Sequence, residues 1–581
     1  MDTEKEIIAY KKKIQFDNLN LVFIILSIYI ELYMLRVFSG TFKTLAPKYF
    51  MINILLLYSL IMIFYSIFKK IKPTLIVIYT CIFVILGVLN YVVIDITGSP
   101  FSFFNLYIWK SALNSLDSFS INFNMYFYIA VFIFIVNMIL VIFFIKEDEW
   151  VNRISKKKLF VLGVFIILTI WLFATPKLYY ITNKSDYKYG TLYRFLKTTK
   201  NVSLEKPAGY SEQKVKEILD KYKDNTQINI EDKPNIIVIM NESLADINSI
   251  YNMGLENNLT FINSLSNNTK LYSTVFGNRT ANSEFEFLTG FSTTFYSEDI
   301  IPYQKYIKSN KYTLVQLLKD SGYKTIAYHP YISTSYNRSE VYKFFGFDNI
   351  VFNDEIGRLN VSKIYDSDMN MYNKIIDLFE NKEKKDKIFD FNITLQNHTP
   401  FSIDFEKMKI KYPEYLDKIN DFEREYQYKY NLDEQKLSTY LNYSNVSDKA
   451  FEHLVNYFKD YDEKVIILLF GDHQPKIKTL YNNEIKNYLV SYALWCNYEA
   501  PQEEIDKISV NYLSTVLTKM SGIENTKQFC FISELRKKIP VITRMKYLGD
   551  NNTWYKINDK KSPYYDLIKE YEYLQYYYMT H

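Results

Sequence analysis

The first third of the chain is dominated by long apolar stretches, whereas the remainder alternates short apolar runs with polar and charged segments. Five apolar stretches stand out, at residues 20–38, 50–68, 74–95, 125–145 and 159–175. A helix needs about 20 mostly apolar residues to cross a bilayer, and most of the five stretches approach that length. We therefore predict a transmembrane domain with five helices over residues 1–175.

From residue 234 onward the pattern changes to alternating strands and helices. Short runs rich in β-branched residues, at 236–240, 323–328, 388–395 and 464–470, are typical of buried strands. Amphipathic segments separate these runs, as expected for helices between strands. This alternation predicts an α/β domain with a mainly parallel central sheet, which we place over residues 231–581.

Two polar segments complete the organisation of the chain. Residues 176–230 are rich in Lys and Tyr, and the helical pattern at 211–222 begins with Ser211 as an N-cap. We interpret this region as a juxtamembrane helical linker. The tail, 546–581, contains many tyrosines, so we expect it to pack back on the α/β domain.

Charges in the loops predict the orientation in the membrane. The N-terminus and the 69–73 and 146–158 loops carry four, three and five basic residues, whereas the opposite loops carry only three. The positive-inside rule then puts the N-terminus in the cytoplasm, and an odd number of spans puts the second domain outside the cell membrane. Glu31 and Arg36 are nearly the only charges within the spans, which favours an anchor over a transporter.

Composition excludes several classes of protein. The 581 residues include 69 Lys and Arg against 64 Asp and Glu, and because the two signs alternate we expect no nucleic-acid partner. Three cysteines occur, and Cys81 lies in an apolar stretch, so at most one disulfide is available outside the membrane. The abundance of Lys, Asn, Ile and Tyr suits an AT-rich Gram-positive-type bacterium.

Chemically competent side chains follow the predicted strands directly. Glu242 follows the first strand, His329 the second, His398 the third, and Asp472 with His473 the fourth. Parallel α/β sheets bind ligands at the carboxyl ends of their strands, so we expect these side chains to meet at one edge.

Glu242, Asp472 and His473 together suit a divalent cation: Mn²⁺, Mg²⁺ or Zn²⁺. Taken singly, Glu242 fits equally well as a helix-capping carboxylate, and Asp472 as a turn residue after Gly471. Their joint position after two separate strands favours a metal site.

Two further residues are open to more than one interpretation. Thr280 follows a loop that contains Gly277, and the first interpretation of Thr280 is a helix N-cap. If a metal ion activated its hydroxyl, Thr280 would also be a nucleophile. Arg338, near Tyr336, would suit an anionic headgroup, but by itself it fits a surface ion pair better.

Taken together, these residues resemble the lipoteichoic acid synthases, membrane members of the sulfatase and alkaline-phosphatase-like superfamily. The similar segments are PNIIVIMNES (234–243), RTANSEF (279–285), YHPYISTSYNR (328–338), TLQNHTPF (394–401) and FGDHQP (470–475). The resemblance covers nearly the whole chain, including the five spans and the external catalytic domain.

The resemblance implies roles for individual residues. The metal positions, usually occupied by Mn²⁺, fall on Glu242, Thr280, Asp472 and His473, with Thr280 also the nucleophile. The positions that hold the phosphoglycerol group fall on His329, Arg338 and His398, together with Tyr336. The family often has Trp at position 336 and Asp at position 331, where this chain has tyrosines at both positions. The formylglycine motif of soluble sulfatases is missing from the sequence, so we do not expect sulfatase activity.

The implied reaction transfers glycerol phosphate from phosphatidylglycerol, through a phosphothreonine-type intermediate, to a glycolipid or teichoic acid chain. His398 is the expected acid or base. One alternative is a phosphoethanolamine or phosphoglycerol transferase that decorates a lipid or glycan without polymerising. Phosphoethanolamine transferases usually carry several disulfides, which argues against that variant. A non-catalytic membrane receptor or scaffold is the alternative of another class, and it predicts that at least one metal or nucleophile position is lost.

Overall fold

The structure is a computed structural model of the whole chain. It describes residues 25–28, 30, 47–67, 70–71, 73–97, 101–106, 125–144, 148–149, 163, 189–199, 204–223, 233–297, 300–353, 367–398, 434–475, 477, 485–501, 503–523 and 525–581. Two compact units are present. The first comprises Met1–Trp109, Ser120–Ser203 and Ser297–Ile300, and the second comprises Lys110–Phe119, Leu204–Tyr296 and Ile301–His581.

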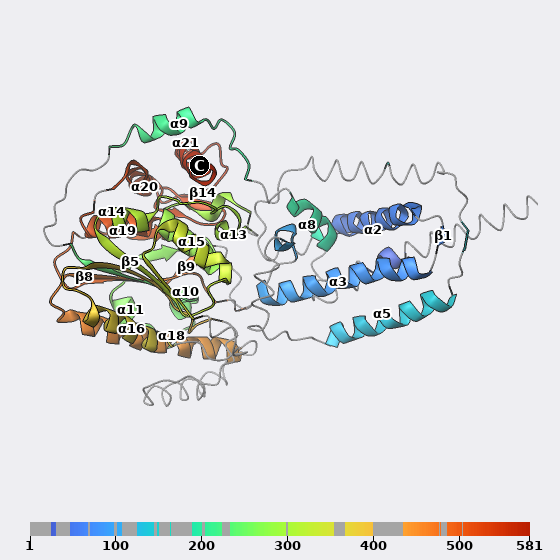
Figure 1. Cartoon of the computed structure of the whole chain (residues 1–581), viewed down its shortest axis with the longest axis horizontal. Helices are drawn as coiled ribbons and strands as arrows, with labels where there is room; N and C mark the ends of the chain where they lie inside the picture. The colour runs from blue at the N-terminus through green and yellow to red at the C-terminus, as the bar shows by residue number, and fades with distance from the viewer. Residues whose placement is uncertain are drawn as a thin grey trace, which may run out of the picture. The chain divides into compact units, whose positions relative to one another are not determined.

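The first unit is built from apolar helices. They are α2 (Pro47–Ile67), α3 (Pro73–Thr97) and α5 (Met125–Phe144), with the 3₁₀ turn η3 (Phe103–Leu106) and the short helix α8 (Thr191–Thr198) (Figure 1). Asn53 of α2 is fully buried and binds the start of α8, since its amide donates to Tyr189 O at 2.9 Å and accepts from Tyr193 N at 2.8 Å. A buried amide that is satisfied in this way fixes one helix against the other.

Three of the five predicted spans coincide with α2, α3 and α5. By length and composition, one stretch in the described part of the chain is long and apolar enough to cross a membrane, Val77–Ile94 of α3, with a mean hydropathy of 2.5. The apolar parts of α2 and α5 are shorter. The predicted spans 20–38 and 159–175 lie almost entirely outside the described residues, so a five-helix transmembrane domain is not confirmed.

A small sheet joins two loops of this unit. Strand β1 (Lys70–Ile71) pairs antiparallel with β2 (Asp148–Glu149), and Lys70 lies opposite Glu149. These strands belong to the two loops that we predict to be cytoplasmic, and their pairing requires both loops to lie at the same end of the helices.

The second unit contains a six-stranded sheet in the order β10–β8–β3–β7–β5–β6. All neighbours are parallel except β10, which runs antiparallel to β8 at one edge. The strands are β3 (Asn235–Asn241), β5 (Tyr323–His329), β6 (Asn349–Phe352), β7 (Lys387–Ile393), β8 (Val465–Gly471) and β10 (Tyr492–Cys496). The prediction of a mainly parallel α/β sheet is therefore confirmed, and the four strands expected from the sequence are β3, β5, β7 and β8.

Helices cover both faces of this sheet, as buried parallel strands require (Figure 1). The helices are α10 (Ile247–Tyr251), α11 (Thr260–Ser264), α12 (Thr280–Thr289), α13 (Pro302–Lys305), α14 (Leu314–Asp320), α15 (Arg338–Phe345), α16 (Asp368–Asn381), α18 (Glu434–Lys459), α19 (Leu513–Met520) and α20 (Lys527–Lys538). Short 3₁₀ turns are η7 (Thr293–Phe295), η8 (Ser335–Asn337), η12 (Lys486–Tyr488) and η13 (Val510–Tyr512).

The two faces bury different side chains. On one face, β3 and β8 contribute isoleucines to a core with Phe379 of α16 and Phe458 of α18. On the other face, Phe287 of α12 stacks on Phe391 of β7 at 5.7 Å and contacts Phe470 of β8 at 5.2 Å between ring centroids. Every residue of α12 is buried, so this helix is part of the core.

Smaller elements complete the unit. One three-stranded sheet consists of β4 (Lys270–Tyr272), β9 (Leu489–Val490) and β11 (Lys507–Ser509), and another consists of β12 (Val541–Ile542), β13 (Lys546–Leu548) and β14 (Trp554–Lys556). The tail ends in α21 (Tyr565–Thr580), where buried Tyr571 donates to Gly290 O at 2.7 Å. In the linker, α9 (Glu212–Leu219) begins at Ser211, whose side chain accepts from Lys214 N, and Lys221 pairs with Glu570 of α21.

Close packing at the end of β8 generates a stability prediction. A Cβ at Gly471 would lie 1.9 Å from the carbonyl oxygen of Leu244, so Gly471→Ala must displace backbone. We expect a loss of about 1–3 kcal/mol or more, measured as a lower Tm of the full chain in detergent. Gly254→Asn is the control, because that position has φ +71° with no atom within 4 Å, and Asn tolerates this conformation. Equal Tm values for the two variants would contradict the prediction.

A buried acid in α12 predicts a pH dependence of stability. Burial raises the pKa of Glu286 to about 7, so the folded state holds a proton that the unfolded chain loses near pH 4.5. The protonated Glu286 therefore adds to the free energy of unfolding below about pH 4.5. This contribution, on the order of 3 kcal/mol, is lost as the pH rises to about 7. Glu286→Gln should flatten this part of a plot of unfolding free energy against pH, whereas exposed Glu383→Gln should not. An unchanged slope in the Gln variant would show that Glu286 is not the responsible group.

Candidate active site

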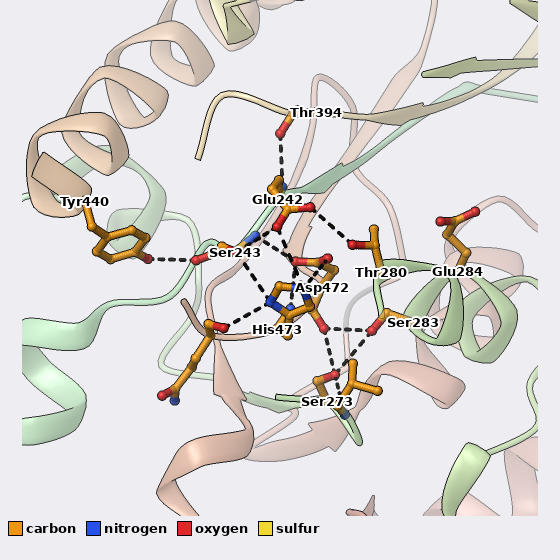
Figure 2. Close-up of polar contacts among 12 residues, drawn as sticks. Glu242, Ser243, Ser273, Thr280, Ser283, Glu284, Thr394, Tyr440, Asp472 and His473 are labelled. Atoms are coloured by element: carbon orange, nitrogen blue, oxygen red, sulfur yellow. Dashed lines mark hydrogen bonds and ion pairs between the residues drawn. The ribbon is translucent and has the colours of Figure 1, made fainter. Parts of the chain in front are cut away.

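The carboxyl ends of β3 and β8 bring three candidate ligands together. The register pairs Asn241 with Gly471, so Glu242 and Asp472 leave adjacent strands side by side. One ligand atom from each of Glu242, Asp472 and His473 lies within 4.8 Å of the others, and all three residues are buried. Figure 2 shows these side chains converging on one point, with Thr280 beside them.

The hydrogen bonds leave specific atoms available in this cluster. Oδ1 of Asp472 accepts from the backbone N–H of Ser243 at 2.7 Å and of His473 at 2.8 Å. Oδ2 is buried without a hydrogen-bond partner among the described residues and lies 3.2 Å from Nε2 of His473. Nδ1 of His473 lies 3.0 Å from Gln474 O, which fits the tautomer that leaves the Nε2 lone pair toward the carboxylates.

Electrostatics at this cluster also fit a cation. Burial and the charge of Glu242 raise the pKa of Asp472 to about 7. Burial opposes the charge on Glu242 as well, but His398, His473 and hydrogen bonds from Ser243 and Thr280 outweigh it and keep the pKa of Glu242 below its usual value. Two buried carboxylates, an imidazole and an unpartnered carboxylate oxygen form a donor set that suits a divalent metal ion.

Thr280 is the first residue of α12, and its side chain does not cap that helix. Arg279 occupies the N-cap position with φ +70°, and no side chain makes a capping hydrogen bond there. The Thr280 hydroxyl instead donates to Oε2 of Glu242 at 3.2 Å. The N-cap interpretation was therefore wrong, and the structure places this hydroxyl in the candidate metal cluster.

Arg338 is not a surface residue. Its side chain is 2% exposed, and its guanidinium binds Glu284 of α12 with Nη2 at 2.6 Å and Nε at 3.0 Å from Oε1. Burial works against the charge, but Glu284 outweighs it and raises the pKa of Arg338. The interpretation as a surface ion pair was wrong because the partner lies in the core. Since Glu284 neutralises the guanidinium, Arg338 would orient an anion by directed hydrogen bonds more than by net charge.

Three more residues of the predicted site lie near the Arg338–Glu284 ion pair or the candidate metal cluster. The Tyr336 ring lies 4.9 Å from the guanidinium of Arg338, in cation–π contact. His329 is buried, and burial with the charge of Arg338 holds its pKa well below the usual value, so its ring is neutral at pH 7. His398 lies close enough to influence the pKa of both Glu242 and His329. Tyr331 contacts His329 with 6.1 Å between ring centroids.

The remaining residues of interest lie elsewhere. His453 of α18 contacts Asn373 of α16, and His581 ends the chain beside Tyr577. Residues 399–401 of the TLQNHTPF segment lie outside the described residues. All three cysteines are free thiols in the structure.

Sequence reasoning did not find the polar network beneath the site. Oδ2 of Asp368 accepts from Asn241 at 2.8 Å and from Ser447 at 2.6 Å, while the Asn397 amide donates to Oδ1 of Asn241 at 2.9 Å. Asn241 and Asn397 directly precede Glu242 and His398, so the network fixes the backbone that presents both side chains. Their position at strand ends was visible in the sequence, but Asp368, which binds Asn241, and Ser447, which binds both Asp368 and Asn397, were not.

Backbone strain gathers at the same place. Among the eight non-glycine residues with positive φ in the described part of the chain, four surround the cluster: Ser243 (53°), Arg279 (70°), Tyr336 (54°) and Asn337 (65°). Such conformations cost about 1–3 kcal/mol each and are retained mainly at functional sites.

Comparison with known proteins agrees with this geometry. Residues 234–522 match the sulfatase family. A protein of Rhizobium meliloti named for cyclic β-1,2-glucan modification is 30% identical over 338 residues, which are 55% of this chain and 50% of that protein. This chain therefore spans about half the length of that relative.

Two solved structures are similar in fold. The Streptococcus pyogenes phosphoglycerol transferase GacH, in complex with sn-glycerol-1-phosphate, has a TM-score of 0.50 and 22% identity, covering 64% of this chain and 95% of its own. The integral membrane lipooligosaccharide phosphoethanolamine transferase A of Neisseria meningitidis has a TM-score of 0.50 and 12% identity, covering 86% of this chain and 95% of its own. At these identities the likeness establishes the fold alone. Residues 234–522, just under half of the chain, thus form a sulfatase-family domain.

Proposed function

We propose that the protein is a membrane-anchored, metal-dependent transferase that moves glycerol phosphate from phosphatidylglycerol to a glycolipid or growing teichoic acid chain, through an ester on Thr280. One observation carries this proposal. The Thr280 hydroxyl, at the start of a buried helix, donates to Glu242, which itself belongs to the cluster with Asp472 and His473. A hydroxyl held against a candidate metal ligand is the arrangement that nucleophilic catalysis on a phosphodiester requires.

The cation would be held by Glu242, Asp472, His473 and the Thr280 hydroxyl. Our first choice for this cation is Mn²⁺, with Mg²⁺ or Zn²⁺ as alternatives. When bound, such an ion lowers the pKa of a coordinated hydroxyl and offsets negative charge on phosphate oxygens.

In the first half-reaction, Oγ1 of Thr280 forms a bond to phosphorus while the bond from phosphorus to the diacylglycerol oxygen breaks. The Thr280 proton has an acceptor within reach, since Oε2 of Glu242 lies 3.2 Å away. We assign His398 as the acid that protonates the departing diacylglycerol oxygen. Arg338, held by Glu284, and neutral His329 would orient the phosphoglycerol group.

In the second half-reaction, a hydroxyl of the acceptor attacks the phosphothreonine ester. His398 takes the proton of that hydroxyl, the bond between phosphorus and Thr280 breaks, and the threonine oxygen regains its proton from Glu242. Both residues thus return to their starting protonation states. The product carries one more glycerol phosphate.

Several observations support a lipid donor. Val77–Ile94 of α3 has the length and composition of a membrane span, and an anchored domain stays close to lipid headgroups. GacH, the fold relative from Streptococcus pyogenes, is a phosphoglycerol transferase that was solved with a glycerol phosphate. We propose a multi-pass arrangement in the cell membrane, with the N-terminus in the cytoplasm and the catalytic domain outside.

A second candidate is transfer to a glycan without polymerisation, because the 30% identical relative is named for modification of a cyclic glucan. Transfer of phosphoethanolamine is a variant suggested by the Neisseria meningitidis fold relative. A non-catalytic scaffold is disfavoured, since that hypothesis predicts loss of at least one metal or nucleophile position, whereas all four residues are present and converge.

The nucleophile can be tested by mass. Full-length protein in detergent, loaded with Mn²⁺ and phosphatidylglycerol, should gain a phosphoglycerol adduct on Thr280. Thr280→Ala should abolish the adduct and lower turnover at least about a thousandfold, because the attacking oxygen is lost. Thr289→Ala is the matched control on the same helix, where the hydroxyl bonds only to nearby backbone.

The other outcomes separate the alternatives. An adduct from phosphatidylethanolamine in place of phosphatidylglycerol would keep the chemistry and change the donor. An adduct that persists in Thr280→Ala would remove Thr280 as nucleophile. Failure to bind any divalent cation would overturn the metal-dependent reaction and favour the scaffold.

A further inference from the structure

We propose that Ser243 is a positioning residue that sets which atoms of Glu242, Asp472 and His473 face the metal ion. The inference rests on the proposed function, because it concerns the same metal site. Ser243 directly follows Glu242 at the end of β3 and is 2% exposed. It contacts all three candidate ligands, although it is not expected to bind the metal itself (Figure 2).

The contacts use two different groups of the serine. Its hydroxyl donates to Oε1 of Glu242 at 2.7 Å, and its backbone N–H donates to Oδ1 of Asp472, also at 2.7 Å. The same hydroxyl lies 3.4 Å from Nδ1 of His473 and can accept from it, since its own proton goes to Glu242. One residue therefore engages one atom on each ligand.

These contacts decide which atoms remain for a cation. Ser243 engages Oδ1 of Asp472, and together with Gln474 O, which is 3.0 Å away, it engages Nδ1 of His473. Oδ2 and Nε2 are left facing each other at 3.2 Å. Oε2 of Glu242 is turned toward Thr280 while Ser243 holds Oε1. Partners that hold the second atom of a metal ligand fix its orientation and tautomer, and their loss typically weakens metal binding about 10- to 100-fold.

The backbone conformation of Ser243 would suit glycine better than serine, which indicates a role for the serine side chain. Its φ of +53° lies in the left-handed region, where glycine would be unstrained and serine is not. The turn is held there from outside, because Tyr440 of α18 donates to Ser243 O at 2.8 Å and accepts from Ala245 N at 3.0 Å. Glycine would satisfy this backbone but would supply no hydroxyl to Glu242 or His473. The chain thus keeps a strained residue at this position, and the serine hydroxyl is the polar group that glycine could not supply.

The test separates the hydroxyl from the backbone. Full-length protein in detergent is stripped with EDTA, and its affinity for Mn²⁺ is measured by calorimetry and by the loss of free Mn²⁺ signal in electron paramagnetic resonance. The variants are Ser243→Ala, which keeps the strain, and Ser243→Gly, which relieves it. Asn267→Gly is the matched control, because Asn267 also has positive φ (50°) and is not part of the candidate metal cluster.

We expect both Ser243 variants to bind Mn²⁺ about tenfold or more weakly than the wild type. The metal-free Ser243→Gly protein should nevertheless have a Tm equal to or above that of the wild type, because the strain is gone. Asn267→Gly should change the Tm without changing Mn²⁺ affinity. A stable protein with a weakened site would show that the hydroxyl positions the ligands and is not merely structural.

Two results would overturn the inference, and they are distinguishable. If the wild type binds Mn²⁺ and both Ser243 variants bind it within twofold, Ser243 does not position the ligands, while the proposed function stands. If the wild type binds no divalent cation, the metal site fails, and the proposed function fails with it. Should Ser243→Ala not fold, Ser243→Gly alone decides, since its backbone is unstrained.

Discussion

The parallel pairing of β3 with β8 is the interaction on which the rest of the candidate active site depends. Its register puts Asn241 opposite Gly471, so the next residues, Glu242 and Asp472, emerge side by side. Gly471 makes this possible, since a side chain there would collide with the carbonyl of Leu244 in the turn after β3. Two carboxylates that are far apart in sequence thereby share one buried point, where the most direct compensation for their charge is a cation.

Helix α12 links this point to the rest of the site. It begins with Thr280 at the candidate metal cluster, and one turn later Glu284 binds Arg338 and accepts from the Tyr342 hydroxyl at 2.7 Å. The candidate nucleophile and the anchor of the candidate phosphate-orienting arginine are thus on one rigid element. Because α12 is packed against β7 and β8 by Phe287, a shift of this helix would move both groups together.

The candidate active site also contains several features that lower the stability of the folded protein. In the described part of the chain, four non-glycine residues with positive φ, a buried ion pair and a carboxylate oxygen without a hydrogen-bond partner all belong to the segments that form this site. Each opposes stability, and the surrounding network of Asn241, Asp368 and Asn397 holds the arrangement in place. Strain and buried charge retained at one location are more readily explained by function than by folding.

The sequence alone determined the four central strands, the apolar helices and most of the candidate groups. Periodicity and strand-end position are local properties, so the strands β3, β5, β7 and β8, the helices α2, α3 and α5, and residues such as Glu242, Asp472 and His473 could be found by inspection. From spacing alone, Thr280 was interpreted as a helix N-cap. The resemblance to the lipoteichoic acid synthases added it to the candidate catalytic groups. The number of membrane spans stays a prediction, because two of the five apolar stretches lie almost entirely outside the described residues.

Only the tertiary structure decided how these groups interact. That Thr280 faces Glu242, that Arg338 is buried against Glu284, and that Ser243 touches three ligands at once all depend on which strands and helices become neighbours. Apart from the contact between the neighbours Ser243 and Glu242, those contacts join residues separated by tens to hundreds of positions, and no local pattern encodes them. Strand register and the packing of α12 set them, because a rotation or a slip of one residue would point each side chain elsewhere.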